Sequence, residues 1–295
     1  MDLQQVLKDL KPEKDFFVGI DSDGCAFDTM EIKQKECFCP NAIKHWELQK
    51  VSKYARETWE FVNLYSRTRG SNRFLALIES LRLLALRPEV IARNVDIPDL
   101  SPLLEWTKKE TKLGNPTLDA YARTADSEII DRALVWSFSV NADIKDLVYR
   151  IPPFPLVREC LEKLSPLADA IVVSQTPLEA LEREWKENSL DGFVRIIAGQ
   201  EYGTKTEHIA LAAKGKYPDE KILMIGDAPG DMKAAKNNGV LFFPINPGHE
   251  EASWEVLYGE GLDRFFAGSY AGNYENQLID KFNQYLPEKP EWQTI

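Results

Sequence analysis

Two aspartates separated by one residue, Asp21 and Asp23, follow the apolar run 16–20 near the start of the chain. Such a run predicts a buried strand of a parallel sheet, and ligands bind at the carboxyl ends of these strands. Residues i and i+2 of an extended segment point the same way, so one carboxylate can attack while the other transfers a proton. A divalent cation would offset the cost of burying both. A plain turn is the alternative, because Asp-Ser-Asp-Gly favours turns.

Three further polar residues follow apolar runs in the second half of the chain, namely Ser174, Lys205 and Asp227. Parallel strands end at the same edge of their sheet. We therefore expect these three residues to converge with Asp21 and to form a single site.

In this order, Asp21-x-Asp23-Gly24, Ser174, Lys205 and Gly226-Asp227-x-x-x-Asp231 resemble the four motifs of the haloacid dehalogenase (HAD) superfamily. The resemblance implies an α/β fold, in which a parallel sheet flanked by helices forms a Rossmann-like core. It also implies an all-helical cap domain, of the C1 type, inserted directly after the first motif. The motifs lie in the two end portions of the chain and do not cover its middle.

The resemblance gives each motif residue an expected role. Asp21 would be the nucleophile that forms an aspartyl-phosphate, and Asp23 would be the general acid and base. Lys205 would neutralise Asp21 and a phosphoryl oxygen. Ser174 and the backbone N–H of Gln175 would bind the phosphate at the start of the next helix.

The expected cofactor is Mg²⁺, which prefers oxygen ligands. By the same resemblance, its ligands would be Asp21, the backbone carbonyl of Asp23, and Asp227. Asp231 has three possible roles: it binds the metal through water, it orients Lys205, or it is an acidic residue that favours a helix N-terminus.

Two departures from the family pattern affect these expectations. Gly203-Thr204-Lys205-Thr206 replaces the commoner Lys-Pro pair, and Lys214 competes for the role of the motif lysine. Cys25 stands where the family usually has threonine, whereas Gly24 and Asp28 are retained, so the loop geometry is expected to survive.

Retention of Asp23 bears on the type of reaction. In the family that the chain resembles, phosphatases and phosphomutases keep this second aspartate, whereas dehalogenases and phosphonatases lack it. The favoured function is a Mg²⁺-dependent phosphatase that hydrolyses a small phosphorylated metabolite. A phosphomutase and a non-catalytic module that binds a phosphorylated ligand remain alternatives.

The middle of the chain predicts helices. Phe74, Leu77, Leu81 and Leu84 form one apolar stripe with helical spacing, and Ser71 is a plausible N-cap for it. The proline-rich run 151–155 predicts a domain boundary. The expected organisation is an α/β core of residues 1–28 and 151–295 with a helical cap of residues 29–150.

Specificity is expected to come from this cap. Arg67, Arg69 and Arg73 lie around a glycine-containing turn, where they would bind a second anionic group of the substrate. Solvent-exposed arginines beside a turn are the alternative. Three tryptophans of the middle segment are expected to form the interior of the cap: Trp46, Trp59 and Trp106.

From Pro155 onward strands and helices alternate, which predicts a parallel sheet. The expected strands span residues 169–174, 193–198, 221–226 and 240–245. The tail from His249 is expected to pack on the core, with a last helix near residues 275–286.

The composition of the chain limits the classes of binding partner that are expected. The 295 residues carry a formal net charge of −11, which disfavours nucleic acid and anionic membranes as partners. Four cysteines in a chain of this length do not indicate a disulfide framework, so a reduced, cytoplasmic protein is expected. No apolar run approaches the length that spans a membrane.

Overall fold

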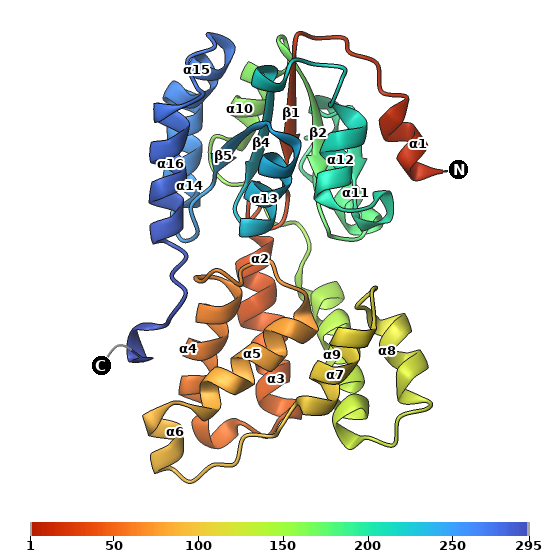
Figure 1. Ribbon diagram of the computed structural model, residues 1–295, viewed down its shortest axis with the longest axis vertical. Coiled ribbons are helices and arrows are strands. Elements are labelled where there is room, and N and C mark those ends of the chain that lie inside the picture. The colour runs from red at the N-terminus through yellow and green to blue at the C-terminus, as the bar shows by residue number, and fades with distance from the viewer. Residues whose placement is uncertain (1, 294–295) are drawn as a thin grey trace. The chain divides into compact units, whose positions relative to one another are not determined.

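The computed structural model describes residues 2–293 and divides into two compact units (Figure 1). The first, which we call the sheet unit, consists of residues 2–30 and 150–286. The second, the helical unit, consists of residues 31–149 and 287–293. The sequence placed the C-terminal residues in the core, whereas those from 287 to 293 lie with the helices.

The sheet unit contains five strands, all parallel, in the order β3-β2-β1-β4-β5. Their bounds are β1 Phe16–Ile20, β2 Ala168–Val173, β3 Ile196–Ala198, β4 Ile222–Gly226 and β5 Leu241–Pro244. The predicted parallel sheet is thereby confirmed. The third strand begins three residues later than predicted, and Phe193 belongs to a 3₁₀ turn that precedes it.

Helices cover both faces of this sheet. They are α1 Leu3–Lys8, α10 Val157–Leu164, α11 Leu178–Glu187, α12 Lys205–Ala212, α13 Pro229–Asn238, α14 Glu250–Val256, α15 Leu262–Phe266 and α16 Asn273–Gln284. A further short helix, α2 Thr29–Ile32, runs from the sheet unit into the helical unit.

The central strand β1 is apolar on both of its sides. Val18 and Ile20 join the cluster that packs against α10, α11 and α14, whereas Phe17 joins the cluster on the opposite face. Ile20 is paired with Val172 of β2 and with Ile225 of β4. The carboxyl ends of the three central strands therefore lie at one edge of the sheet, as the sequence predicted.

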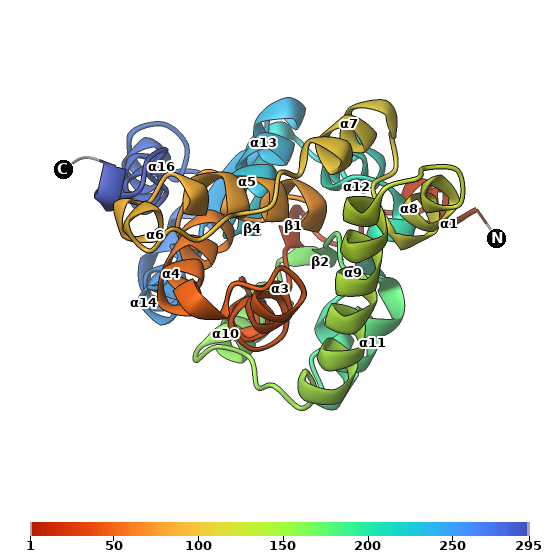
Figure 2. The ribbon, with the colours of Figure 1, turned by 90° about the horizontal axis from the view of Figure 1, so that it is seen from below.

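The helical unit is built from α3 Cys39–His45, α4 Ser52–Asn63, α5 Arg73–Ala85, α6 Pro88–Ala92, α7 Ser101–Lys109, α8 Asn115–Ala122 and α9 Glu128–Leu147 (Figure 2). Trp46, Trp59 and Trp106 are buried in the larger of its two apolar clusters, as expected. Asn72, not Ser71, caps α5, because its side chain accepts a hydrogen bond from Phe74 N at 3.0 Å.

The last described residues attach to the helical unit through Trp292. The guanidinium of Arg87 lies 4.3 Å from the centre of the Trp292 ring, and Phe61 meets the same ring edge-on at 5.6 Å. Six residues earlier, Leu286 is buried in an apolar cluster of the sheet unit. The predicted last helix thus packs on the sheet unit, while the residues after it do not.

The four cysteines are buried and form no disulfide in the described chain, as expected. None of the helices between residues 2 and 293 has the length and apolarity needed to span a membrane.

Asp169, the second residue of β2, anchors the N-terminal segment. It is buried and accepts hydrogen bonds from Glu13 N, Lys14 N, the Tyr217 hydroxyl and the Arg195 guanidinium, at 2.6 to 3.0 Å. Burial by itself raises the pKa of the Asp169 carboxyl, but these donors lower it below its ordinary value. The ionised form therefore stabilises the fold.

Asp169→Asn is expected to lower the free energy of unfolding at pH 7 by about 2–4 kcal/mol, because the buried donors lose a charged acceptor. A carboxyl whose pKa is lowered by folding contributes stability above its unfolded pKa of about 3.9 and loses it as the pH falls through the folded pKa. Urea unfolding should therefore show that the free energies of unfolding of Asp169→Asn and wild type differ less at pH 3 than at pH 7.

The matched control is Asp219→Asn, which alters an exposed pair with Lys214. That variant should change stability by less than about 0.5 kcal/mol. An Asp169→Asn variant as stable as wild type at pH 7 would show that the network does not anchor the segment.

Candidate active site

Asp21 lies directly after β1 and is held on three sides. Its backbone N–H donates to Ile225 O at 3.0 Å, which fixes the residue against β4. Its Oδ1 accepts a hydrogen bond from Ser22 N at 2.8 Å, and its Oδ2 lies 2.6 Å from Lys205 Nζ. The carboxylate is therefore buried, oriented and paired with a cation.

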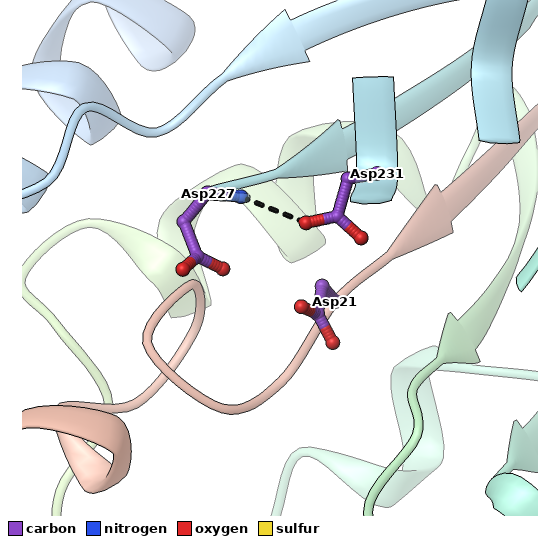
Figure 3. A group of neighbouring side chains, drawn as sticks. All are labelled: Asp21, Asp227 and Asp231. Atoms are coloured by element: carbon purple, nitrogen blue, oxygen red, sulfur yellow. Dashed lines mark hydrogen bonds between the residues drawn. The ribbon is translucent and has the colours of Figure 1, made fainter. Parts of the chain in front are cut away.

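Asp231 contacts the same lysine from the other side. Its Oδ1 lies 2.5 Å from Lys205 Nζ, and its Oδ2 accepts a hydrogen bond from Ala228 N at 3.0 Å. The same Oδ2 accepts a second hydrogen bond from Asp227 N at 3.1 Å (Figure 3). Both oxygens are thus engaged, so Asp231 orients Lys205 and also caps the first turn of α13. Two of the three roles open from sequence, orienting the lysine and favouring the helix N-terminus, are compatible with these contacts.

Three carboxylates face one ammonium at this site. Carboxylate oxygens of Asp21, Asp227 and Asp231 lie within 4.8 Å of one another, and all three residues are buried. Burial raises the pKa of the Asp21 carboxyl well above its ordinary value; Lys205 opposes this, while Asp231 and Asp227 reinforce it. Although burial lowers the pKa of Lys205, the three carboxylates raise it above its ordinary value.

The excess of negative charge fits a divalent cation. Oxygen donors in a cluster of this size are what Mg²⁺ or a similar hard cation requires. A bound cation would offset both the burial and the repulsion from Asp231 and Asp227 that raise the Asp21 pKa. Both oxygens of Asp21 and both oxygens of Asp231 already accept hydrogen bonds, so these contacts do not by themselves decide which carboxylates would be direct ligands.

Lys205 is positioned by a capping box at the start of α12. Thr204 Oγ1 accepts a hydrogen bond from Glu207 N at 3.3 Å, and Thr204 N donates to Glu207 Oε2 at 2.7 Å. This motif does what proline would do after the family's usual lysine, since it fixes where the helix begins. Lys214, the competing lysine, instead pairs with the exposed Asp219 at 2.5 Å.

Ser174 and Gln175 lie after β2, next to β1. Ser174 Oγ accepts a hydrogen bond from Thr176 N at 3.2 Å, which leaves the hydroxyl hydrogen able to donate. The backbone N–H of Gln175 donates to no group in the described chain. The Gln175 side chain donates to Gly203 O at 2.9 Å, so it ties this loop to the loop before Lys205.

The loop that carries Asp23 is wound around the carbonyl of Ser22. That oxygen accepts hydrogen bonds from the backbone N–H groups of Cys25, Ala26 and Phe27. The side chain of Asp23 is oriented by Thr29, whose buried hydroxyl donates to Asp23 Oδ1 at 2.7 Å. Thr29 was not among the predicted site residues, and no spacing pattern singles it out.

A second unpredicted support lies beneath the same loop. Ser22 Oγ donates to Glu184 Oε2 at 2.8 Å and accepts from Trp185 Nε1 at 3.0 Å. Both partners belong to α11. This helix therefore fixes the residue between the two aspartates.

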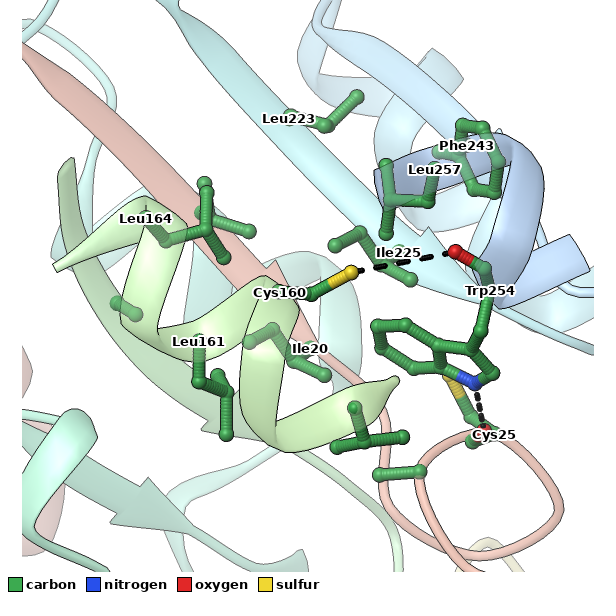
Figure 4. Packing of buried hydrophobic residues seen from close by; sticks show 14 of the residues in the cluster. Ile20, Cys25, Cys160, Leu161, Leu164, Leu223, Ile225, Phe243, Trp254 and Leu257 are labelled. Carbon is green, nitrogen blue, oxygen red and sulfur yellow. Dashed lines mark hydrogen bonds between the residues drawn. The ribbon is translucent and has the colours of Figure 1, made fainter. Parts of the chain in front are cut away.

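The side chain of Cys25 lies in an apolar cluster of the sheet unit (Figure 4). Its side chain is fully buried, and its carbonyl accepts a hydrogen bond from Trp254 Nε1 at 2.9 Å. Burial raises the pKa of the Cys25 thiol well above its ordinary value, so the thiol stays neutral. The replacement of threonine is thus accommodated by packing.

The three arginines expected to set specificity lie in the helical unit and differ from one another. Arg67 is half-exposed and lies 3.7 Å from Glu288, and the buried Arg69 donates to Leu64 O at 2.9 Å. Among residues 2–293, the hydrogen-bond acceptors of Arg73 are neutral and belong to Ser137 and Asn141.

Gly226, the last residue of β4, permits the close approach of Asp231. A Cβ atom at this position would lie 2.3 Å from Asp231 Cβ and 2.6 Å from Asp231 Oδ2. No real side chain tolerates such distances, so only glycine leaves room for this aspartate.

Gly226→Ala is expected to push the first turn of α13 away from β4, which breaks the contact between Asp231 and Lys205. Overpacking of this kind costs about 1–3 kcal/mol or more, and we expect the activity to fall by at least about 100-fold. Chemical unfolding and steady-state kinetics measure the two effects. Gly230→Ala is the control, because nothing lies within 4 Å of its Cβ position. Equal stability and equal activity of the Gly226→Ala and Gly230→Ala variants would refute this role for Gly226.

The chain matches the profile of the family described as haloacid dehalogenase-like hydrolase over residues 104–245. This range contains Ser174, Lys205, Asp227 and Asp231, whereas the first motif lies outside it. No curated protein matches the sequence.

Solved structures that match this chain come from several bacteria. A Lactobacillus delbrueckii protein inferred to be a phosphoglycolate phosphatase has a TM-score of 0.50 at 16% identity, covering 85% of this chain and 98% of that one. CbbY from Rhodobacter sphaeroides, solved in complex with phosphate, has a TM-score of 0.43 at 14% identity over 78% and 85% of the two chains. A Thermotoga maritima protein inferred to be a β-phosphoglucomutase has a TM-score of 0.46 at 16% identity over 83% and 99%.

The first of these similarities extends over nearly the whole relative and concerns the fold. The parallel sheet, the helical insertion and the family match agree with the motif order found in the sequence. Residues 104–245 are thus similar to haloacid dehalogenase-like hydrolases, and the fold of the chain agrees with that similarity.

Proposed function

We propose that this protein is a phosphatase that hydrolyses a small phosphorylated metabolite through an aspartyl-phosphate on Asp21. The observation that carries the proposal is the placement of Lys205 between Asp21 and Asp231, beside Asp227, at the carboxyl ends of β1 and β4. A second carboxylate, Asp23, follows the nucleophile at the spacing that acid–base catalysis requires.

In the first step, a carboxylate oxygen of Asp21 attacks phosphorus and the bond from phosphorus to the leaving oxygen breaks. Asp23 gives its proton to that oxygen, so the alcohol leaves neutral. Lys205 holds Asp21 in place by its 2.6 Å contact and offers positive charge to the phosphoryl oxygens. The Ser174 hydroxyl and the unengaged N–H of Gln175 supply further donors to those oxygens.

In the second step, Asp23 takes a proton from water and the resulting hydroxide attacks the phosphorus of the aspartyl-phosphate. The bond to Asp21 breaks, inorganic phosphate leaves and both aspartates return to their starting states. Thr29 keeps Asp23 oriented for both proton transfers through its 2.7 Å hydrogen bond.

The acidic cluster would bind a divalent cation, and members of the superfamily generally use one. We propose Mg²⁺, with Asp21, Asp227 and the backbone carbonyl of Asp23 as the protein ligands. The ion would supply positive charge that lowers the cost of bringing an anionic substrate to a carboxylate nucleophile.

The test is release of inorganic phosphate from an aryl phosphate by the purified chain, with Mg²⁺ and with a chelator, followed by a panel of phosphorylated metabolites. Metal-dependent release supports a phosphatase and excludes a module that only binds. Transfer of the phosphoryl group within a sugar phosphate, without release of phosphate, would identify a mutase instead. Absence of turnover with every substrate and several divalent cations would refute the proposal.

A further inference from the structure

Ser22, which lies between the two aspartates of the site, carries a fully buried hydroxyl that is hydrogen-bonded in both directions. Its Oγ donates to Glu184 Oε2 at 2.8 Å and accepts from Trp185 Nε1 at 3.0 Å. An indole N–H only donates and a carboxylate only accepts, so the direction of each hydrogen bond is fixed. The side chain of Ser22 therefore has one preferred orientation, which α11 sets.

The backbone of Ser22 is hydrogen-bonded to both parts of the site. Its N–H donates to Asp21 Oδ1 at 2.8 Å. Its carbonyl oxygen accepts hydrogen bonds, at 3.0 to 3.3 Å, from the backbone N–H groups of three residues in the loop that carries Asp23. A shift of Ser22 would therefore displace the donor that orients the Asp21 carboxylate and would disturb the loop that follows.

Packing alone does not require a hydroxyl at this position. Val18 and Ile20 precede Ser22 at intervals of two residues, and both belong to the apolar cluster that also contains Trp185. An apolar side chain would continue this pattern and would avoid the cost of burying a polar group. Hydrogen bonds depend on direction, so the hydroxyl restricts the orientation of residue 22 where an alkyl group would not.

We infer that the Ser22 hydroxyl and the Trp185 indole are a positioning pair for the nucleophile. Held by Trp185 and Glu184, Ser22 keeps its N–H aimed at Asp21 Oδ1, so the carboxylate keeps one orientation when the substrate arrives. Trp185 is a positioning residue and not a catalytic one, because it acts only through Ser22. The inference rests on the proposed role of Asp21 as the nucleophile.

Trp185→Phe keeps an aromatic ring in the cluster but removes the indole donor. We expect kcat for an aryl phosphate, at saturating divalent cation, to fall about 10- to 100-fold while KM changes by less than about threefold, because the nucleophile is less well oriented. Ser22→Ala should do the same, since it removes the hydroxyl and leaves the indole N–H without its acceptor. Both variants break the same hydrogen bond, so the double variant should lose little more than the worse single variant.

Glu182→Gln is the matched control, because Glu182 lies on the same helix and pairs with the exposed Lys186 at 3.9 Å. Its kcat should equal that of wild type. A purely structural role predicts a lower Tm with an unchanged kcat, and that result in Ser22→Ala would overturn the inference. Losses that multiply in full in the double variant would also overturn it. If Trp185→Phe does not fold, Ser22→Ala decides alone.

Amide hydrogen exchange gives a test that does not depend on turnover. In Ser22→Ala and Trp185→Phe, the protection of the backbone amide of residue 22 should fall at least about tenfold more than that of the Ile20 amide in β1. Equal changes at the two amides would show that the pair does not hold this N–H on Asp21. Should wild type hydrolyse no phosphate ester, the proposed phosphatase function fails, while the exchange rates still decide whether the pair orients the Asp21 carboxylate.

Discussion

Asp21→Asn is expected to lower kcat/KM for a phosphate ester by at least about 10⁴-fold, because an amide cannot form the covalent intermediate. The replacement has nearly the same shape, and Asn can still accept the hydrogen bond from Ser22 N. The loss should therefore appear in kcat and not arise from unfolding. Steady-state kinetics with an aryl phosphate, at saturating divalent cation, measure it.

The same substitution should leave the protein as stable as wild type or more stable when no cation is present. Asp21 is buried with two other carboxylates against one lysine, and its raised pKa shows that its charge is disfavoured there. Replacing Asp21 by a neutral residue removes its repulsion with the other two carboxylates and the cost of burying its charge. Catalytic groups often destabilise the folded protein in this way. Thermal unfolding in a chelator tests this.

Asp219→Asn, an exposed carboxylate outside the site, is the control for both measurements. An Asp21→Asn protein that keeps near-normal turnover would show that another residue is the nucleophile. If Asp21→Asn is inactive because it is unfolded, Asp21→Glu tests whether Asp21 is the nucleophile. This replacement keeps the charge but displaces the carboxylate oxygens. Near-normal turnover by that variant would likewise count against Asp21.

Lys205→Met is expected to lower the free energy of unfolding by about 3–5 kcal/mol at neutral pH, because it leaves three buried carboxylates without their shared cation. Activity should fall by at least about 10³-fold, since Asp21 loses the contact that orients it and the phosphate loses a positive charge. Urea unfolding and the aryl phosphate assay give the two values.

The matched control is Lys214→Met, which removes the lysine that competes for the same motif in the sequence. Lys214 pairs with an exposed aspartate, so its loss should cost less than about 1 kcal/mol and leave turnover intact. In the double variant Lys205→Met/Asp231→Asn, stability should partly return, because one of the unpaired charges is gone. If Lys214→Met lost activity and Lys205→Met kept it, Lys214 and not Lys205 would be the lysine of the site.

The edge of the sheet could be predicted because short-range patterns specify it. Apolar runs ending in Asp21, Ser174 and Asp227 define where three strands stop, and parallel pairing brings their ends together. The start of α12 is also encoded locally, since Thr204-x-x-Glu207 is a capping box. The catalytic roles of these residues remain predictions until they are tested.

The supports of the site could not be predicted, because their partners lie far apart in sequence. Glu184 and Trp185 reach Ser22 across more than 160 positions, and Ser137 and Asn141 reach Arg73 across more than 60. Nothing local shows that an arginine will meet amides and hydroxyls in place of carboxylates. The contacts of Asp231 with Lys205, Asp227 and Ala228 likewise could not be predicted from the spacing alone.

The position of β1 has a consequence for synthesis of the chain. This strand occupies the middle of the sheet, yet its neighbours β2 and β4 begin only at Ala168 and Ile222. On the ribosome, nearly all of the helical insertion emerges before the first strand can find any partner, so helices are expected to form while that strand stays unpaired. Nascent chains halted before residue 168 should therefore expose the apolar segment Phe16–Ile20 to chaperones, and chains halted after residue 226 should protect it.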